Sequence, residues 1–119
     1  MRTYWVYILA SRPYGTLYIG VTNDLIGRIR LHREGRGAKF TGQYAVDMLV
    51  HFEPFGDIET AIRREKSLKH YRRQWKINVI EQDNPHWLDL YPQLLALPEN
   101  RVLRPRGEMG PRHEPEDDN

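Results

Sequence analysis

Arg28 and His32 are two side chains whose chemistry does not suit the helix positions that they occupy. In the stretch TLYIGVTNDLIGRIRLH, helical spacing makes Leu25 and Ile29 core-facing and places Arg28 and His32 along the edge of that face, one turn apart. The simplest explanation is an arginine that extends to water beside a partly buried histidine. The alternative is a site that needs a cation and a titratable ring on one helix.

Glu65 is a carboxylate on the apolar side of a second predicted helix. In the stretch IETAIRREKSLKHY it falls in the middle of a stripe with core-facing spacing, whose members are Ile58, Ala61, Ile62 and Leu68. Burial disfavours a carboxylate unless a cation meets it, so either an ion pair with a nearby arginine or a bound metal would explain this position. The basic residues beside it are expected to face solvent: Arg63, Arg64, Lys66 and Lys69.

Two tyrosines complete a set that suits the hydrolysis of phosphodiester bonds. Tyr7 and Tyr18 lie on two predicted strands that form a hairpin. In such a reaction an arginine stabilises the charge of the transition state, and a glutamate holds a divalent cation. A tyrosine or histidine orients or deprotonates the attacking water. A phenol with a pKa of about 10 is a poor base unless nearby cations, such as Arg28 or a metal, lower that pKa.

The predicted hairpin consists of TYWVYIL at 3–9 and TLYIGVT at 16–22, both rich in aromatic and β-branched residues. RPYG at 12–15 supplies the turn, because proline fixes φ and glycine accepts positive φ. A loop symmetric about positions 12 and 13 would place Tyr7 directly opposite Tyr18 in the ladder.

After the hairpin the sequence predicts a helix, a basic loop, a third strand and two or three further helices. The first helix is capped by Asn23 or Asp24, runs to about Glu34 and closes at Gly35, and the loop GRGAKFTGQY at 35–44 and a strand at 46–52 follow it. A second helix, capped by Asp57, covers 58–71. A helical segment over 73–82, with or without a kink near Tyr71, and a short helix around 86–96 complete the order. The order β-β-α-β-α-α indicates an α+β fold with helices packed on a small antiparallel sheet.

Length and composition favour a single domain, expected over residues 1–98, followed by a disordered charged tail over 99–119. The chain has no cysteine, so disulfides and thiolate metal sites are excluded. It also has no run long enough for a membrane span, and we expect a cytoplasmic protein. Residues 1–82 contain fourteen Lys and Arg against eight Asp and Glu. This basic balance favours a polyanionic partner such as nucleic acid.

The same residues carry a resemblance to the GIY-YIG nuclease superfamily, in particular to its small single-domain members. Tyr18-Ile19-Gly20 match the YIG half, and Trp5-Val6-Tyr7 occupy the GIY half with Trp and Val in place of Gly and Ile. Arg28 matches the family's catalytic arginine, His32 the histidine often found one turn later, and Glu65 the metal-binding glutamate. The correspondence spans about residues 3–82.

The resemblance implies a three-stranded antiparallel sheet flanked by helices and one Mg²⁺ or Mn²⁺ ion bound through Glu65. It places Tyr7, Tyr18, Arg28 and His32 around the scissile phosphate. The family also uses an asparagine after the glutamate, for which Asn78 is the nearest candidate, whereas Asn84 is more typical of a capping turn.

Weaker signals point to contacts with a nucleic-acid backbone. Five basic residues could neutralise phosphates, although each could equally be ordinary solvated surface: Lys39, Lys69, Arg72, Arg73 and Lys76.

The function expected from these residues is a metal-dependent endonuclease that acts on nucleic acid, with DNA and a role in DNA repair as the family-level expectation. Larger relatives gain specificity from appended domains that are not recognisable in this sequence. We therefore expect structure- or damage-directed binding, or targeting by a protein partner. The alternatives are a nucleic-acid-binding module with the same fold and little or no activity, and a structural or interaction protein.

Overall fold

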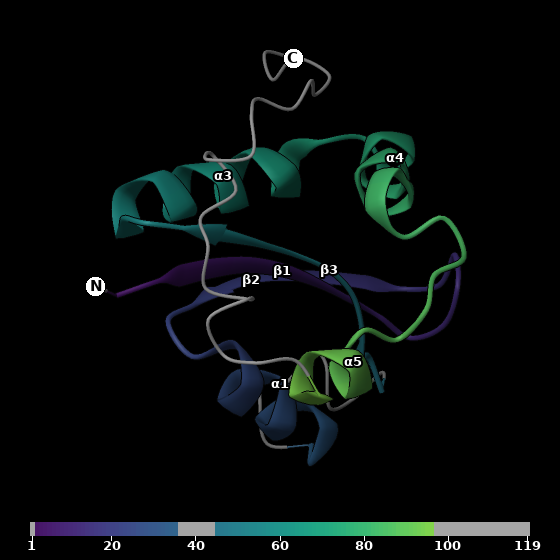
Figure 1. The fold of residues 1–119 in the computed structure, drawn as a ribbon. Coiled ribbons are helices and arrows are strands. Elements are labelled where there is room, and N and C mark those ends of the chain that lie inside the picture. Colours follow the sequence, from purple (N-terminus) through teal and green to yellow (C-terminus); the bar gives the residue numbers. More distant parts are fainter. Residues whose placement is uncertain (1, 36–44, 97–119) are drawn as a thin grey trace.

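The structure, a computed structural model, describes residues 2–35 and 45–96 (Figure 1). Three antiparallel strands form one sheet in the order β2-β1-β3. The elements are β1 (Tyr4–Ala10), β2 (Leu17–Thr22), α1 (Leu25–Arg33), β3 (Met48–Phe55), α3 (Ile58–His70), α4 (Arg73–Asp83) and α5 (Tyr91–Ala96). This confirms the α+β fold and the predicted β-β-α-β-α-α order, to which α5 adds a final short helix. Lys39 and the tail 99–119 lie outside the described residues.

The sheet lies between two layers of helices, with α3 and α4 over one face and α1 and α5 over the other (Figure 1). Successive residues of β1 point to opposite faces. Val6 and Ile8 therefore belong to the core that contains Leu68 of α3, whereas Tyr7 and Leu9 belong to the core that contains Leu25 and Ile29 of α1. In the described ranges no helix has the length and apolar character needed to cross a membrane.

Both helix starts expected at aspartates are confirmed. Asp24 caps α1 through a hydrogen bond from the Gly27 amide to its side chain. Asp57 caps α3 by accepting from the amides of Glu59 and Thr60. At the other end of α3, extended backbone at Tyr71 separates it from α4, so the segment has a break between two helices.

The predicted hairpin register is wrong by two residues. Tyr7 pairs with Gly20, and Tyr18 pairs with Leu9. The turn closes through a hydrogen bond from the Gly15 amide to the Arg12 carbonyl, with a positive φ at Tyr14, so its centre lies one residue later than expected. Because a shift of two residues keeps side chains on the same face, Tyr7 and Tyr18 are diagonal neighbours.

The core-facing side of α3 also differs from the prediction. Ala61 and Leu68 are buried as expected, but Ile58 and Ile62 are 40% and 36% exposed. The third residue turned toward the sheet is Arg64, whose side chain is only 14% exposed. Arg64 was expected to face solvent and instead meets Glu53 of β3, which runs three residues beyond the predicted strand end. The sheet-facing side of α3 thus includes a charged residue paired with β3.

Candidate active site

Tyr7 of β1 and His32 of α1 form the buried part of the site. The Tyr7 hydroxyl lies 3.1 Å from His32 Nε2, and the two side chains belong to the layer between the sheet and α1. Both residues are almost fully buried, with 1% and 2% exposed. The i+7 position from Leu25 therefore turns His32 toward the sheet, where the tyrosine meets it.

Gly20, the last residue of the YIG triplet, makes room for Tyr7. The two residues are directly paired across the hairpin. A Cβ added at Gly20 would lie only 2.5 Å from Cζ of Tyr7 and closer still to its hydroxyl oxygen. The Tyr7 ring therefore crosses over the glycine, and any larger residue would displace it.

Replacing Gly20 by alanine should lower the free energy of unfolding by about 1–3 kcal/mol, because the added Cβ would force the buried Tyr7 ring to shift. Urea unfolding measures this loss, and the matched control is Gly56→Ala, since a Cβ at Gly56 meets nothing within 4 Å. Equal stabilities of the two variants would contradict the steric role of Gly20.

Tyr18 and Arg28 form the more accessible part of the site, since both are of intermediate exposure. The Tyr18 ring lies 5.3 Å from the His32 ring and 6.3 Å from the Tyr7 ring, measured between centroids. The Arg28 guanidinium hydrogen-bonds to the hydroxyl of Tyr7 and to that of Tyr18, and these contacts raise the pKa of Arg28. One cation thus bridges the two tyrosines of the motif.

Glu65 belongs to α3 and has a side chain that is 13% exposed. Its Oε2 atom lies 2.7 Å from Nζ of Lys69, one helical turn later. The expected ion-pair partner was an arginine, and the structure shows a lysine instead. The Glu65 charge also contributes to the raised pKa of Tyr7, so the carboxylate acts electrostatically on the tyrosine cluster from the other helix layer.

Residues 3–78 match the family described as the GIY-YIG catalytic domain. The chain belongs to the GIY-YIG family. The match covers the hairpin, α1 and α3, and so contains Tyr7, Tyr18, Arg28, His32 and Glu65. The domain is that of a nuclease superfamily, as the resemblance implied.

Individual relatives of this GIY-YIG protein carry the name UPF0213. A UPF0213 protein of Staphylococcus haemolyticus is 37% identical over 82 residues, which cover 69% of this chain and 99% of the relative. One of Haloquadratum walsbyi is 38% identical over 79 residues, covering 66% of this chain and 88% of the relative. The solution NMR structure of a UPF0213 protein from Bacillus halodurans is 32% identical, covers 73% of this chain and 92% of its own, and has a TM-score of 0.48.

Burial is the largest cause of the shifted pKa values of Tyr7 and His32. It raises the pKa of Tyr7 to about 12, although the hydrogen bond from Arg28 acts in the opposite direction. Burial, with a smaller contribution from the Arg28 charge, lowers the pKa of His32 to about 4. At neutral pH the phenol is therefore protonated and the imidazole neutral. The Tyr7 oxygen accepts from Arg28, and the tautomer of His32 decides whether the Tyr7 hydroxyl donates to Nε2 or accepts from it. Arg28 thus lowers the pKa of Tyr7 as expected, but burial outweighs this effect.

His32 should make the protein less stable as the pH falls from 6.5 toward 4. Between its ordinary pKa of 6.5 and its folded value of about 4, only the unfolded chain binds a proton at this residue, so acidification favours unfolding. Urea unfolding at several pH values measures the slope. His32→Gln, which cannot titrate, should show a shallower slope, and an unchanged slope would contradict the buried neutral imidazole.

The residues around Glu65 fit a metal that keeps most of its ligands as water and substrate oxygens. Within 2–35 and 45–96, no three His, Cys, Asp or Glu side chains gather closely enough to enclose an ion. Mg²⁺ needs no such cage, because it commonly binds one or two carboxylates and completes its shell with water and phosphate. Glu65 is the residue that could hold such an ion, and its Oε2 atom already contacts the Lys69 ammonium.

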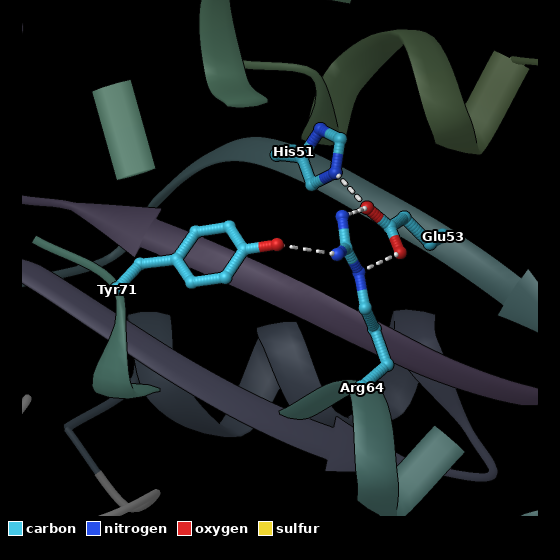
Figure 2. Close-up of polar contacts among 4 residues, drawn as sticks. All are labelled: His51, Glu53, Arg64 and Tyr71. Carbon is cyan, nitrogen blue, oxygen red and sulfur yellow. Dashed lines mark hydrogen bonds and ion pairs between the residues drawn. The ribbon is translucent and has the colours of Figure 1, made fainter. Parts of the chain in front are cut away.

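A buried polar network beneath α3 was not recognised in the sequence (Figure 2). The Glu53 carboxylate accepts two hydrogen bonds of 2.9 Å from Arg64 and lies 2.7 Å from His51 Nε2. Arg64 Nη1 also donates to the Tyr71 hydroxyl at 3.4 Å. Burial opposes the ionisation of Glu53, but His51 and Arg64 hold its pKa well below the ordinary range. The signal in the sequence was the position of Arg64, three residues after Ala61 and four before Leu68.

The remaining predicted site residues lie on or near α4. Asn78 is exposed and accepts a hydrogen bond from Gln74. Asn84, at the end of α4, is buried and donates to the carbonyls of Val50 and Leu88, which confirms its expected role in a capping turn. The structure thus gives Asn84 a structural role and leaves Asn78 accessible.

The predicted backbone-binding residues have different environments. Arg73 Nη2 donates to the carbonyls of Tyr14 and Gly15, so this arginine fastens the hairpin turn to α4. The Arg72 guanidinium lies 5.5 Å from the Trp75 ring centroid. Partial burial, with a contribution from Arg73, lowers the pKa of Lys76. Lys69 forms an ion pair with Glu65.

Proposed function

We propose that this GIY-YIG protein is a divalent-metal-dependent endonuclease that hydrolyses phosphodiester bonds in DNA. The observation that supports this most directly is the Arg28 guanidinium held between the hydroxyls of Tyr7 and Tyr18. An arginine with fixed donors and partial access to solvent is suited to bind a phosphate and to stabilise the charge that develops on it. The Glu65 carboxylate, whose charge contributes to the raised pKa of Tyr7, supports metal dependence.

The burial of each residue suggests a division of roles. Tyr7 and His32 are almost fully buried, so their contribution is to hold Arg28 in place. Tyr18 is more accessible, and its hydroxyl, in contact with Arg28, can orient the attacking water. The water oxygen forms a bond to phosphorus and gives up a proton to solvent as the bond to the leaving oxygen breaks, and the leaving oxygen takes up a proton from solvent. A Mg²⁺ or Mn²⁺ ion, when bound at Glu65, supplies positive charge at the phosphate.

Sequence-independent contacts should dominate the binding of nucleic acid. The basic balance of residues 1–82 and the exposed Arg72 favour contact with phosphates, which carries no sequence information. Lys39 and the partly buried Lys76 are further candidates for such contacts. We therefore propose a substrate recognised by its structure or damage, as in DNA repair, or delivered by a protein partner, in the cytoplasm.

A nucleic-acid-binding module without turnover is the second candidate, and the Glu65–Lys69 pair favours it. A carboxylate that already has an ammonium partner at 2.7 Å does not need a metal to offset its burial. The presence of Glu65 is therefore compatible with both candidates, and only an activity measurement separates them.

The test is a fluorescent substrate panel that reports binding and cleavage together. It contains duplex, nicked, flap, branched and single-stranded DNA and one RNA, at low salt with Mg²⁺ or Mn²⁺. Cleavage of one DNA structure that EDTA abolishes would support the endonuclease. Binding without cleavage of any member with either metal would support the binding module, and cleavage of the RNA alone would reassign the substrate.

A further inference from the structure

Lys69 is the polar partner of Glu65, the residue that would hold the metal. The two charged groups are 2.7 Å apart on α3, separated by one helical turn. The carboxylate side chain is 13% exposed and the lysine side chain 51% exposed, so the lysine reaches from solvent to a largely buried acid. The pair therefore lies at the border between the helix surface and the proposed site.

Two ordinary features of helices favour this position of the lysine. A glutamate followed by a lysine four residues later is the favourable order for an ion pair on a helix. Lys69 also lies in the last turn of α3, where the helix dipole favours a positive charge. Both effects stabilise the pair on Glu65 without help from any other part of the site.

An ammonium ion and a divalent metal that bind the same carboxylate repel each other. Glu65 Oε2 is already in hydrogen-bonding contact with Nζ, and a metal ion would bring two positive charges to that atom. The lysine therefore opposes binding of the metal, and its movement away from Glu65 would relieve this repulsion. Its long side chain is half-exposed and can move into solvent without disturbing the core.

We propose that Lys69 is an internal counter-ion that competes with the divalent metal for the Glu65 carboxylate. The inference rests on the proposed function, because it assigns the metal to Glu65. Lys69 then sets the metal concentration at which the site fills. The residue was expected only as a phosphate contact, and competition with the metal is a separate role that can be measured without DNA.

The experiment measures Mn²⁺ binding to the full chain by NMR. Mn²⁺ broadens the amide signals of nearby residues, so a titration of ¹⁵N-labelled protein gives a midpoint for the amides around Glu65. Glu65→Gln identifies the broadening that depends on the carboxylate. Lys69→Met removes the competitor, Lys69→Arg keeps a cation at the same place, and the matched control Lys66→Met removes one exposed charge from the same helix.

We expect the Mn²⁺ midpoint at Glu65 to fall by at least about threefold in Lys69→Met, in keeping with the modest strength of a half-exposed pair. Lys69→Arg and Lys66→Met should stay near the wild-type midpoint. Equal midpoints in wild type, Lys69→Met and Lys66→Met would overturn the competition while leaving the metal at Glu65. An equal fall in both methionine variants would also overturn it, as a general effect of charge. If the amides around Glu65 were broadened equally with and without Glu65→Gln, the assignment of the metal to Glu65 would be overturned.

Discussion

Replacing Arg28 by methionine should lower the rate of DNA cleavage by about 10²- to 10³-fold, the usual cost of removing one donor that stabilises transition-state charge. The side chain is of intermediate exposure, so the fold should survive the change. Single-turnover kinetics with enzyme in excess measures the chemical step separately from binding. Arg28→Lys should recover only part of the rate, because an ammonium cannot reproduce the planar fork that bridges two hydroxyls.

The same variant has a second readout that needs no substrate. The Arg28 charge contributes to the lowered pKa of His32, so that pKa should rise in Arg28→Met. An NMR titration of the His32 ring measures the change. A wild-type cleavage rate together with an unchanged His32 pKa would contradict the arrangement in which Arg28 joins the two tyrosines beside the imidazole.

Replacing Arg64 by methionine should lower the free energy of unfolding by about 3–5 kcal/mol, because it leaves the buried Glu53 carboxylate without its bidentate partner. This is a large part of the stability of a domain of this size. The loss should be greatest above the ordinary pKa range of a glutamate, where the unpaired carboxylate is charged. Urea unfolding monitored by circular dichroism measures it.

Two further variants make the Arg64 prediction specific. Arg63→Met removes the neighbouring exposed arginine and should change stability by less than about 0.5 kcal/mol. The double variant Glu53→Gln with Arg64→Met removes the buried charge and should regain part of the loss. Similar losses in Arg63→Met and Arg64→Met would show that the ion pair does not anchor α3.

Local sequence signals predicted the elements of this fold well. Aromatic and β-branched runs marked the hairpin, and Asp24 and Asp57 marked the starts of α1 and α3, because caps and strand propensity act over a few neighbouring residues. The motif residues around Tyr7 were predicted for a different reason. Their spacing is that of the GIY-YIG family, and Gly20 shows the steric requirement behind one of these positions.

The errors arose where contacts between distant segments decide the structure. The hairpin register depends on a positive φ at Tyr14, and a tyrosine in the sequence does not predict a positive φ. The buried face of α3 includes Arg64, which meets Glu53, eleven residues away on another element. The spacing of Arg64 from Ala61 and Leu68 is that of the apolar face, but this periodicity does not show which residue of another element pairs with it.

The protonation state of Tyr7 could also not be predicted from the sequence. Arg28 was expected to lower the pKa of Tyr7, and it does act in that direction. Complete burial of the Tyr7 side chain outweighs it, and burial follows only from the packing of α1 on the sheet. Tyr7 and His32 are therefore buried and Tyr18 is the more accessible of the two tyrosines, which is the basis for the roles proposed for them.

The most direct test of the proposed endonuclease is the single-turnover rate of wild type and Glu65→Gln on the preferred DNA with Mg²⁺. Wild type should cleave it, EDTA should abolish cleavage, and Glu65→Gln should bind the same DNA but react at least about 10³-fold more slowly, because the ion and its charge at the phosphate are lost. Equal rates for the two proteins would contradict the assignment of the metal to Glu65. DNA binding by wild type without cleavage would contradict the nuclease itself.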